Sequence, residues 1–177
     1  MVSVYVWRPG GQNTGHASLL VEPTYISWWP DSSKKFLSAP GEPKRTLAED
    51  TSEEGHPPDW TVQIHGLDEG AMRRFWEGFL LMRHDWQLHN LNCAKAVVLA
   101  LKAGGADDRI GMGASLRRNL APITAFVSPL IAYNIAGVQG IATAFQGDGF
   151  TIGYRGADWF TPVWTPLDAL RYAQSID

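Results

Sequence analysis

Apolar and polar residues alternate along the start of the chain, which is the pattern of half-buried β-strands. In Met1–Arg8 the residues Val2, Val4 and Val6 alternate with Ser3, Tyr5 and Trp7. Two shorter runs of the same kind follow over His16–Glu22 and Tyr25–Trp29, and a later one covers Trp60–Ile64. The turn residues between the first runs predict that the chain opens with two or three strands joined by hairpins.

Two later segments have the apolar spacing of amphipathic helices. One helix is predicted to begin after Asp68, its N-cap, and to run to about Arg83, with one apolar stripe facing the core. The other is predicted from Pro166 to about Ser175, because Thr165 can serve as its N-cap and proline suits the first helical position.

A third predicted helix carries the cysteine of the chain. The run Ala94–Ala103 is helical in pattern, and Gly104 and Gly105 after it suit a left-handed C-cap. Cys93 is therefore expected at or near the first turn of this helix.

Two segments interrupt the regular pattern. Residues 30–58 are rich in proline and end in an acidic run, which predicts a long loop. Residues 120–145 are strongly apolar, but the prolines and glycines within them favour two short buried helices over one that spans a membrane. The open alternative is that this apolar insertion forms a surface that contacts lipid or a partner.

The overall composition is that of one folded domain covering residues 1–177, with 45% hydrophobic and 19% charged residues. A formal net charge of -3 argues against nucleic acid as the main partner. The N-terminus has no basic stretch leading into an apolar run, so no signal peptide of the Sec type is expected. No ligand spacing such as H-E-x-x-H or C-x-x-C occurs, so no metal and no cofactor is expected.

Cys93 is the only cysteine of the chain and cannot form an intramolecular disulfide. It is either an inert buried residue or a reactive thiol. A thiol becomes a nucleophile as the thiolate, and the N-terminus of a helix favours that negative charge. Its predicted place at a helix start makes Cys93 a candidate nucleophile.

A cysteine nucleophile needs a base, and His16 is the best placed of the five histidines. It opens an apolar strand behind Gly15, where a sheet can hold the imidazole against a facing helix. The alternative is a core histidine bonded to backbone. The other histidines lie in the proline-rich loop, after the strand ending at Ile64, and in the turn before the cysteine helix: His56, His65, His84 and His89.

These motifs and their order resemble the circularly permuted papain-like superfamily, which includes permuted NlpC/P60 enzymes, LRAT-type acyltransferases and PPPDE peptidases. The resemblance is carried by 15–19 (Gly-His-Ala-Ser-Leu), 25–30 (Tyr-Ile-Ser-Trp-Trp-Pro), 66–68 (Gly-Leu-Asp) with Met72 and Trp76, and 92–97 (Asn-Cys-Ala-Lys-Ala-Val). More narrowly, the combination is similar to NlpC/P60-like toxin domains delivered by bacterial type VI secretion. It covers roughly residues 1–104, and residues 164–166 extend it toward the C-terminus.

The expected fold is α+β, with an antiparallel sheet of about five strands packed against the Cys93 helix. The resemblance implies that Cys93 is the nucleophile and His16 the general base, acting through a thioester. Ser27 occupies the place of the residue that orients the histidine, where relatives often carry His, Glu, Gln or Asn. Because a hydroxyl orients less strongly than a carboxylate, Glu22 or a backbone carbonyl is the alternative.

The remaining site residues are expected to stabilise the oxyanion or line the cleft. The backbone N–H of Cys93 is one expected oxyanion donor, and Asn92 and Tyr5 are candidates for the second. Trp28 and Trp29 are neighbours on one strand and must face opposite sides, so that one packs in the core and the other can line the cleft. Trp28 is our candidate for substrate binding.

The resemblance implies a cysteine hydrolase that cleaves amide bonds, with bacterial cell-wall peptides as the substrate. Secretion without a signal peptide into the periplasm of a target cell, and an immunity protein in the producing cell, follow by the same analogy. Two alternatives stay open: an LRAT-like enzyme that transfers acyl groups from lipids, with 120–145 facing the membrane, and a non-catalytic binding module with a Trp-rich cleft. A chain that is not secreted is expected in the cytoplasm.

Overall fold

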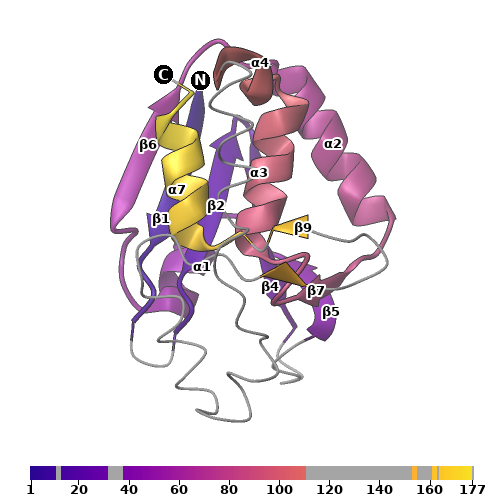
Figure 1. Cartoon of the computed structure of the whole chain (residues 1–177). Helices are drawn as coiled ribbons and strands as arrows, with labels where there is room; N and C mark the ends of the chain where they lie inside the picture. Colours follow the sequence, from indigo (N-terminus) through magenta and orange to yellow (C-terminus); the bar gives the residue numbers. More distant parts are fainter. Residues whose placement is uncertain (11–12, 32–37, 111–152, 155–160, 163, 177) are drawn as a thin grey trace.

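The fold was analysed in a computed structural model that describes residues 1–10, 13–31, 38–110, 153–154, 161–162 and 164–176. It combines antiparallel sheets with helices, which confirms the α+β class (Figure 1). The expected apolar helical insertion at 120–145 lies outside the described residues. None of the described helices is long and apolar enough to cross a membrane.

The main sheet has four strands in the order β3-β2-β1-β6, and all its neighbours are antiparallel. The strands are β1 (Val2–Trp7), β2 (His16–Val21), β3 (Thr24–Ile26) and β6 (Trp60–Ile64). β1, β2 and β6 confirm three of the strands predicted from the alternating pattern. In the β1–β2 register Trp7 pairs with His16 and Tyr5 with Ser18, so these residues share one face of the sheet.

A second sheet has the order β4-β5-β7, formed by β4 (Trp28–Pro30), β5 (Ser38–Pro43) and β7 (Asp85–Gln87). The prediction of one strand over Tyr25–Trp29 was therefore wrong. Where an antiparallel sheet of about five strands was expected, the structure has one sheet of four strands and another of three. The chain leaves the first sheet at Ile26, passes through the buried Ser27 and enters the second sheet at Trp28. A two-stranded sheet of β8 (Gly153–Tyr154) and β9 (Thr161–Pro162) completes the strands that the structure describes.

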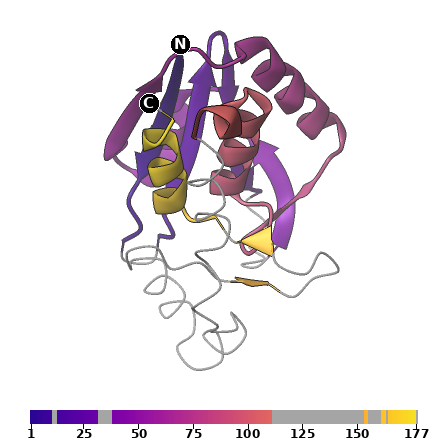
Figure 2. The same ribbon diagram turned by 45° about the horizontal axis from the view of Figure 1, so that its top comes forward.

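Helices cover one face of the main sheet, as Figures 1 and 2 show from two directions. α3 (Cys93–Ala103) packs against β2, and α7 (Pro166–Gln174) packs against β1 and β6. α2 (Glu69–Leu81) packs against α3, and the short α4 (Ala106–Ile110) follows α3. The shared core contains Val4, Leu19, Val97, Leu101 and Leu170. The Cys93 helix thus lies against the sheet, as predicted.

The N-terminal ends of the helices follow the predicted capping. Asp68 caps α2 by accepting from the Ala71 N–H, and Thr165 caps α7 in front of Pro166. At the C-terminus of α3 the left-handed residue is Gly105, with φ of 86°, whereas Gly104 has a negative φ. Gly104 is required for another reason, because a Cβ there would lie 2.8 Å from the Met72 side chain.

The prediction of a long loop over 30–58 was wrong for most of its described part. β5 occupies Ser38–Pro43, and α1 occupies Leu47–Glu54. α1 begins with a capping box, in which Thr46 and Glu49 each satisfy the backbone N–H of the other, and it ends at Gly55 with φ of 78°. The helix has few apolar residues, so hydrophobic spacing did not reveal it, although its capping residues were visible in the sequence.

Candidate active site

His16 lies at the first residue of β2, at the end of the main sheet. Gly15 before it has φ of 74°, and a Cβ at that position would lie 2.6 Å from the Trp7 carbonyl oxygen. The turn into β2 therefore requires glycine. The imidazole of His16 is 2% exposed and stacks on Trp29, with ring centroids 4.2 Å apart, while Trp7 lies 5.5 Å away on another side. Rigid rings thus fix the plane of the imidazole.

Cys93 is the first residue of α3, directly after the N-cap Asn92, and is 7% exposed. Its side chain lies close enough to the His16 imidazole to interact with it electrostatically. The structure therefore brings together the two residues that the sequence analysis paired. The placement at the first turn of a helix is the one expected to favour a thiolate.

The third member of the site is Asp50, which the sequence analysis missed. Asp50 belongs to α1, is fully buried, and places Oδ2 3.2 Å from His16 Nε2. Since Nε2 faces Asp50, the other ring nitrogen, Nδ1, is left for Cys93. A carboxylate that fixes one nitrogen and leaves the other for a thiol is the arrangement of a catalytic triad.

The Asp50 carboxylate accepts hydrogen bonds on both oxygens. Oδ2 accepts from Tyr25 Oη at 2.7 Å in addition to His16, and Oδ1 accepts from Ser27 Oγ at 2.8 Å and Trp29 Nε1 at 2.7 Å. Burial by itself would raise the pKa of Asp50, but the hydrogen bond and charge of His16 and the donors Tyr25 and Ser27 lower it below its ordinary value. Asp50 is thus held as a buried, fully bonded carboxylate.

Charge decides the protonation of His16. Burial alone would lower its pKa, but the electrostatic interaction with Cys93 and the hydrogen bond that Nε2 donates to Asp50 outweigh burial and raise the pKa from 6.5 to about 9. His16 is therefore an imidazolium at neutral pH. The protonated imidazole therefore lies between a thiol and a buried carboxylate.

Ser27 contacts the imidazole as predicted, but it does so as part of the support for Asp50. Its Oγ lies 3.0 Å from His16 Nε2 and donates to Asp50 Oδ1. A serine alone would orient the imidazole weakly, but here the Asp50 carboxylate also contacts the ring. The alternative, Glu22, is exposed and follows the last residue of β2, whereas His16 is the first residue of that strand. The backbone carbonyl of Glu22 accepts a hydrogen bond from Arg73.

Asn92 does not have the predicted role of an oxyanion donor. Its Oδ1 accepts from the Lys95 N–H, and its Nδ2 donates to the carbonyls of Leu88 and Trp164. Because both amide protons are used, this buried side chain has no free donor. It caps α3 and ties the helix start to the segment before α7.

Trp28 and Trp29 do face opposite sides, but the prediction chose the wrong one for the site. Trp28 is 2% exposed and packs edge-on against Trp76 and Phe79 in the core. Trp29 stacks on His16 and binds Asp50 instead. Trp29 is therefore the tryptophan that supports the His16 imidazole.

Tyr5 lies in the layer behind Asp50. Its ring centroid is 6.4 Å from that of Tyr25, whose hydroxyl contacts Ser18 and Asp50. Tyr5 therefore packs near Tyr25, and Tyr25 donates a hydrogen bond to the Asp50 carboxylate. Its predicted role as a second oxyanion donor stays a prediction.

The other four histidines lie on other segments of the chain. His65 is exposed at the end of β6, His84 packs on Phe79, and His89 is half-buried in the turn before α3. His56 is exposed, and its carbonyl accepts from Trp7 Nε1 at 2.8 Å, so its backbone helps to hold a ring next to His16. Of the five, His16 interacts with Cys93.

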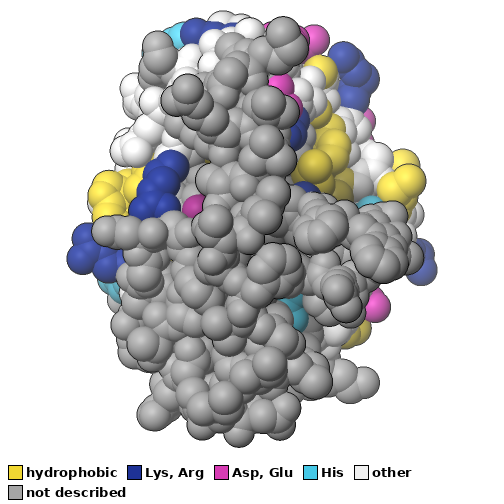
Figure 3. All heavy atoms as spheres, viewed as in Figure 1, with side chains coloured by type: hydrophobic (Ala, Val, Ile, Leu, Met, Phe, Trp, Pro, Cys, Tyr) yellow, Lys and Arg dark blue, Asp and Glu magenta, His cyan; other side chains and the backbone are white. Residues whose placement is uncertain are grey.

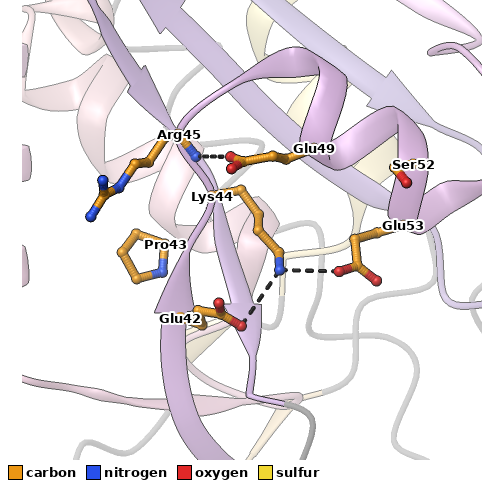
Figure 4. Close-up of a pocket in the computed structure, with 7 residues that line it drawn as sticks. All are labelled: Glu42, Pro43, Lys44, Arg45, Glu49, Ser52 and Glu53. Atoms are coloured by element: carbon orange, nitrogen blue, oxygen red, sulfur yellow. Dashed lines mark hydrogen bonds and ion pairs between the residues drawn. The ribbon is translucent and has the colours of Figure 1, made fainter.

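α1 has two different faces. Its buried residues Asp50 and Glu54 point toward the main sheet, whereas Glu49, Ser52 and Glu53 line a pocket on the outer face (Figure 4). In that pocket Lys44 Nζ lies 3.0 Å from Glu53 and 3.5 Å from Glu42. The outer pocket is thus lined by a solvated ion-pair network. The residue of α1 that contacts His16, Asp50, lies on the inner face of the helix.

No group of three or more metal-binding side chains occurs in the part of the chain that the structure describes. Apolar side chains reach the surface on the side of α2 (Figure 3), where Leu81 and Met82 are 83% and 72% exposed. This surface lies at the end of α2, on a different element from those that hold Cys93, His16 and Asp50.

One family model matches the chain, that of the IcsB middle domain, over residues 42–129. The matched segment includes Asp50 and Cys93 but begins after His16 and Ser27. It spans slightly less than half of the 177 residues. Searches of curated proteins and of solved structures found no match.

Proposed function

We propose that this protein is a cysteine-dependent acyl-transfer enzyme in which Cys93 is the nucleophile, His16 the proton carrier and Asp50 the orienting carboxylate. One observation carries the proposal: three elements that are distant in sequence, β2, α1 and α3, converge on one buried imidazole. A structural histidine needs one partner for its ring, whereas His16 has a carboxylate and a thiol.

The steps follow from the charges. The Cys93 thiolate attacks an acyl carbon, and the carbonyl π electrons move onto oxygen to give a tetrahedral anion. Collapse of this anion breaks the bond to the leaving group, which takes the proton from the His16 imidazolium, and a thioester remains. Neutral His16 then removes a proton from water or another acceptor, which attacks the thioester and releases Cys93. Asp50 holds the ring throughout and compensates its positive charge.

The order of these parts along the chain supports assignment to the circularly permuted papain-like fold. The histidine strand precedes the cysteine helix, and the helix start packs at the end of an antiparallel sheet. Asp50 supplies the carboxylate that appeared to be missing when Ser27 alone was considered.

For the substrate we propose an amide in a bacterial cell-wall peptide, with the protein acting as a secreted effector. The match to the IcsB middle domain, which belongs to a secreted bacterial effector, supports the second part. The raised pKa of His16 supports amide cleavage only in a general way, because an amine leaving group needs a proton donor.

The thiol test addresses the catalytic pair directly. We expect iodoacetamide to alkylate Cys93 at pH 7 at least about tenfold faster than it alkylates N-acetylcysteine, because a helix start and a neighbouring imidazolium both favour the reactive thiolate. His16→Ala is expected to remove most of that difference. Rates are read as the mass gain of intact protein, with His65→Ala as the control for loss of an exposed histidine. Equal rates for wild type and His16→Ala would refute the activated pair.

The substrate is tested with purified wall fragments and mass analysis of the products. Amide hydrolysis gives new amine and carboxyl ends with wild type and none with Cys93→Ala. Transfer of a fatty acyl chain from lipid vesicles to an added amine, dependent on Cys93, would favour the LRAT-like alternative. A Cys93→Ala variant that keeps toxicity would favour the binding module.

A further inference from the structure

β6 (Trp60–Ile64) forms one edge of the main sheet, with β1 as its neighbour. Figures 1 and 2 both show this strand at the outside of the sheet. Within the described part of the chain, no backbone hydrogen bond joins the outer edge of β6 to another segment. The strand therefore presents a row of unpaired N–H and C=O groups, which is the template on which a further strand can pair.

β6 lacks the features by which proteins protect an edge strand. Short length, charged side chains and proline are the usual protection. The other described strands at a sheet edge have three residues or fewer, whereas β6 has five, none of them charged and none a proline. An edge strand of this length and composition is suited to pairing with another strand.

The sequence of β6 is self-complementary when two copies pair in antiparallel orientation. If Val62 of one copy lies opposite Val62 of the other, Trp60 faces Ile64. Thr61 then faces Gln63. Apolar side chains thus meet on the face that packs against the core, and uncharged polar ones meet on the exposed face. A shift by one residue would place apolar side chains opposite polar ones, so this register is favoured.

The residues that flank β6 fit the same register. Asp59 precedes the strand and His65 follows it, and both are exposed. The antiparallel pairing places the Asp59 carboxylate of each copy opposite the His65 imidazole of the other copy. From Asp59 to His65, therefore, no like charges face each other.

We propose that β6 is a self-association surface, to which a second copy of this chain adds its own β6 in antiparallel orientation. The joined sheet then has four strands from each copy, with the helices of both copies on one face. β1 separates β6 from β2, the strand that begins with His16. The self-association surface is thus distinct from the candidate active site, and either proposal can fail without the other.

The test is the molecular mass of the full chain in solution, measured by analytical ultracentrifugation. Protein concentrations run from about 1 to 100 μM, and a reductant keeps the free Cys93 from linking two copies. We expect a reversible dimer with a Kd within this range, since one pair of five-residue strands makes a small interface. A chain that stays monomeric at the highest concentration would overturn the proposal.

Two double variants test the register at exposed positions, where the fold should tolerate substitution. Thr61→Lys with Gln63→Lys places like charges opposite each other twice in the dimer, and we expect the Kd to rise at least about tenfold. Thr61→Lys with Gln63→Glu is the matched control, because it places opposite charges at the same sites. Its Kd should stay within about threefold of wild type. Far-UV circular dichroism checks that both variants are folded.

A mixing experiment separates repulsion from damage to the strand. The variant Thr61→Lys with Gln63→Lys, mixed with Thr61→Glu with Gln63→Glu, should give a dimer again, because each cation then faces a carboxylate. Failure of this mixture to dimerise would overturn the proposal. So would a dimer that the like-charged variant leaves unchanged, because another surface would then hold the copies together.

Discussion

Replacing Asp50 with alanine is expected to lower the free energy of unfolding by about 3–5 kcal/mol, the cost of breaking a buried ion pair from one side. The substitution leaves the buried His16 imidazolium without its carboxylate. It also removes the acceptor for Tyr25, Ser27 and Trp29, which donate to Asp50 in the native protein. The change is measured by guanidinium chloride denaturation at pH 7, followed by tryptophan fluorescence and far-UV circular dichroism.

Two variants separate the buried network from a general effect of charge on α1. Asp50→Asn keeps the shape and the acceptor Oδ1 but loses the charge, so we expect a smaller loss of stability together with slower alkylation of Cys93. Glu53→Ala removes an exposed acid that pairs with Lys44 and should cost less than about 1 kcal/mol. If Asp50→Ala destabilised the protein no more than Glu53→Ala, Asp50 would not be the anion that holds His16.

The sequence was sufficient to identify the two residues whose local setting carries a signal. His16 follows a glycine at the start of an alternating strand, and Cys93 precedes an apolar helical run that ends in two glycines. Both signals are local in sequence. The elements themselves were predictable for the same reason, and β6 matches its predicted bounds.

The carboxylate of the site was harder to predict because its helix has little apolar surface. Residues 30–58 look like a loop when only hydrophobic spacing is used, since α1 buries the polar residues Asp50 and Glu54 and exposes most of its other side chains. The Thr46 and Glu49 pair was the available signal, because it has the spacing of a capping box. Recognising this capping box would have predicted α1 and with it Asp50 as the carboxylate next to His16, a role that Ser27 cannot fill.

Roles that depend on tertiary contacts could not be assigned from the sequence. Asn92 precedes Cys93, which made it a natural candidate for an oxyanion donor, yet the carbonyls of Leu88 and Trp164 accept both of its amide protons. The choice between Trp28 and Trp29 depended on a bend at Ser27 that moves the chain from one sheet to the other. Alternation predicts opposite faces but does not say which face is the core.

We expect the free energy of unfolding to depend on pH through the titration of His16 and Asp50. His16 has a pKa of about 9 in the folded protein and 6.5 as its ordinary value, so the folded state binds more protons than the unfolded state between these limits. Its contribution is therefore fully present below pH 6.5 and is lost as the pH rises through about 9. A shift of this size corresponds to about 3 kcal/mol.

Asp50 acts at the other end of the pH range. Its pKa is lowered on folding, so its contribution is present above the ordinary carboxyl value and is lost as the pH falls through the folded value. Together the two groups predict a stability maximum between them, with a decline on the alkaline side that begins near neutral pH. Unfolding free energies from guanidinium chloride titrations at pH 2 to 10 measure both slopes.

His16→Gln is the variant that identifies the alkaline slope, because it keeps a polar side chain next to Ser27 and Asp50 but cannot titrate. It should flatten the decline between pH 7 and 9 and leave the other titrating residues unchanged. Cys93→Ala should move the decline to lower pH, since the negative charge of Cys93 is the largest contribution that raises the pKa of His16. If the wild-type slope persisted in both variants, another group would cause it and the imidazolium would not be part of the native site.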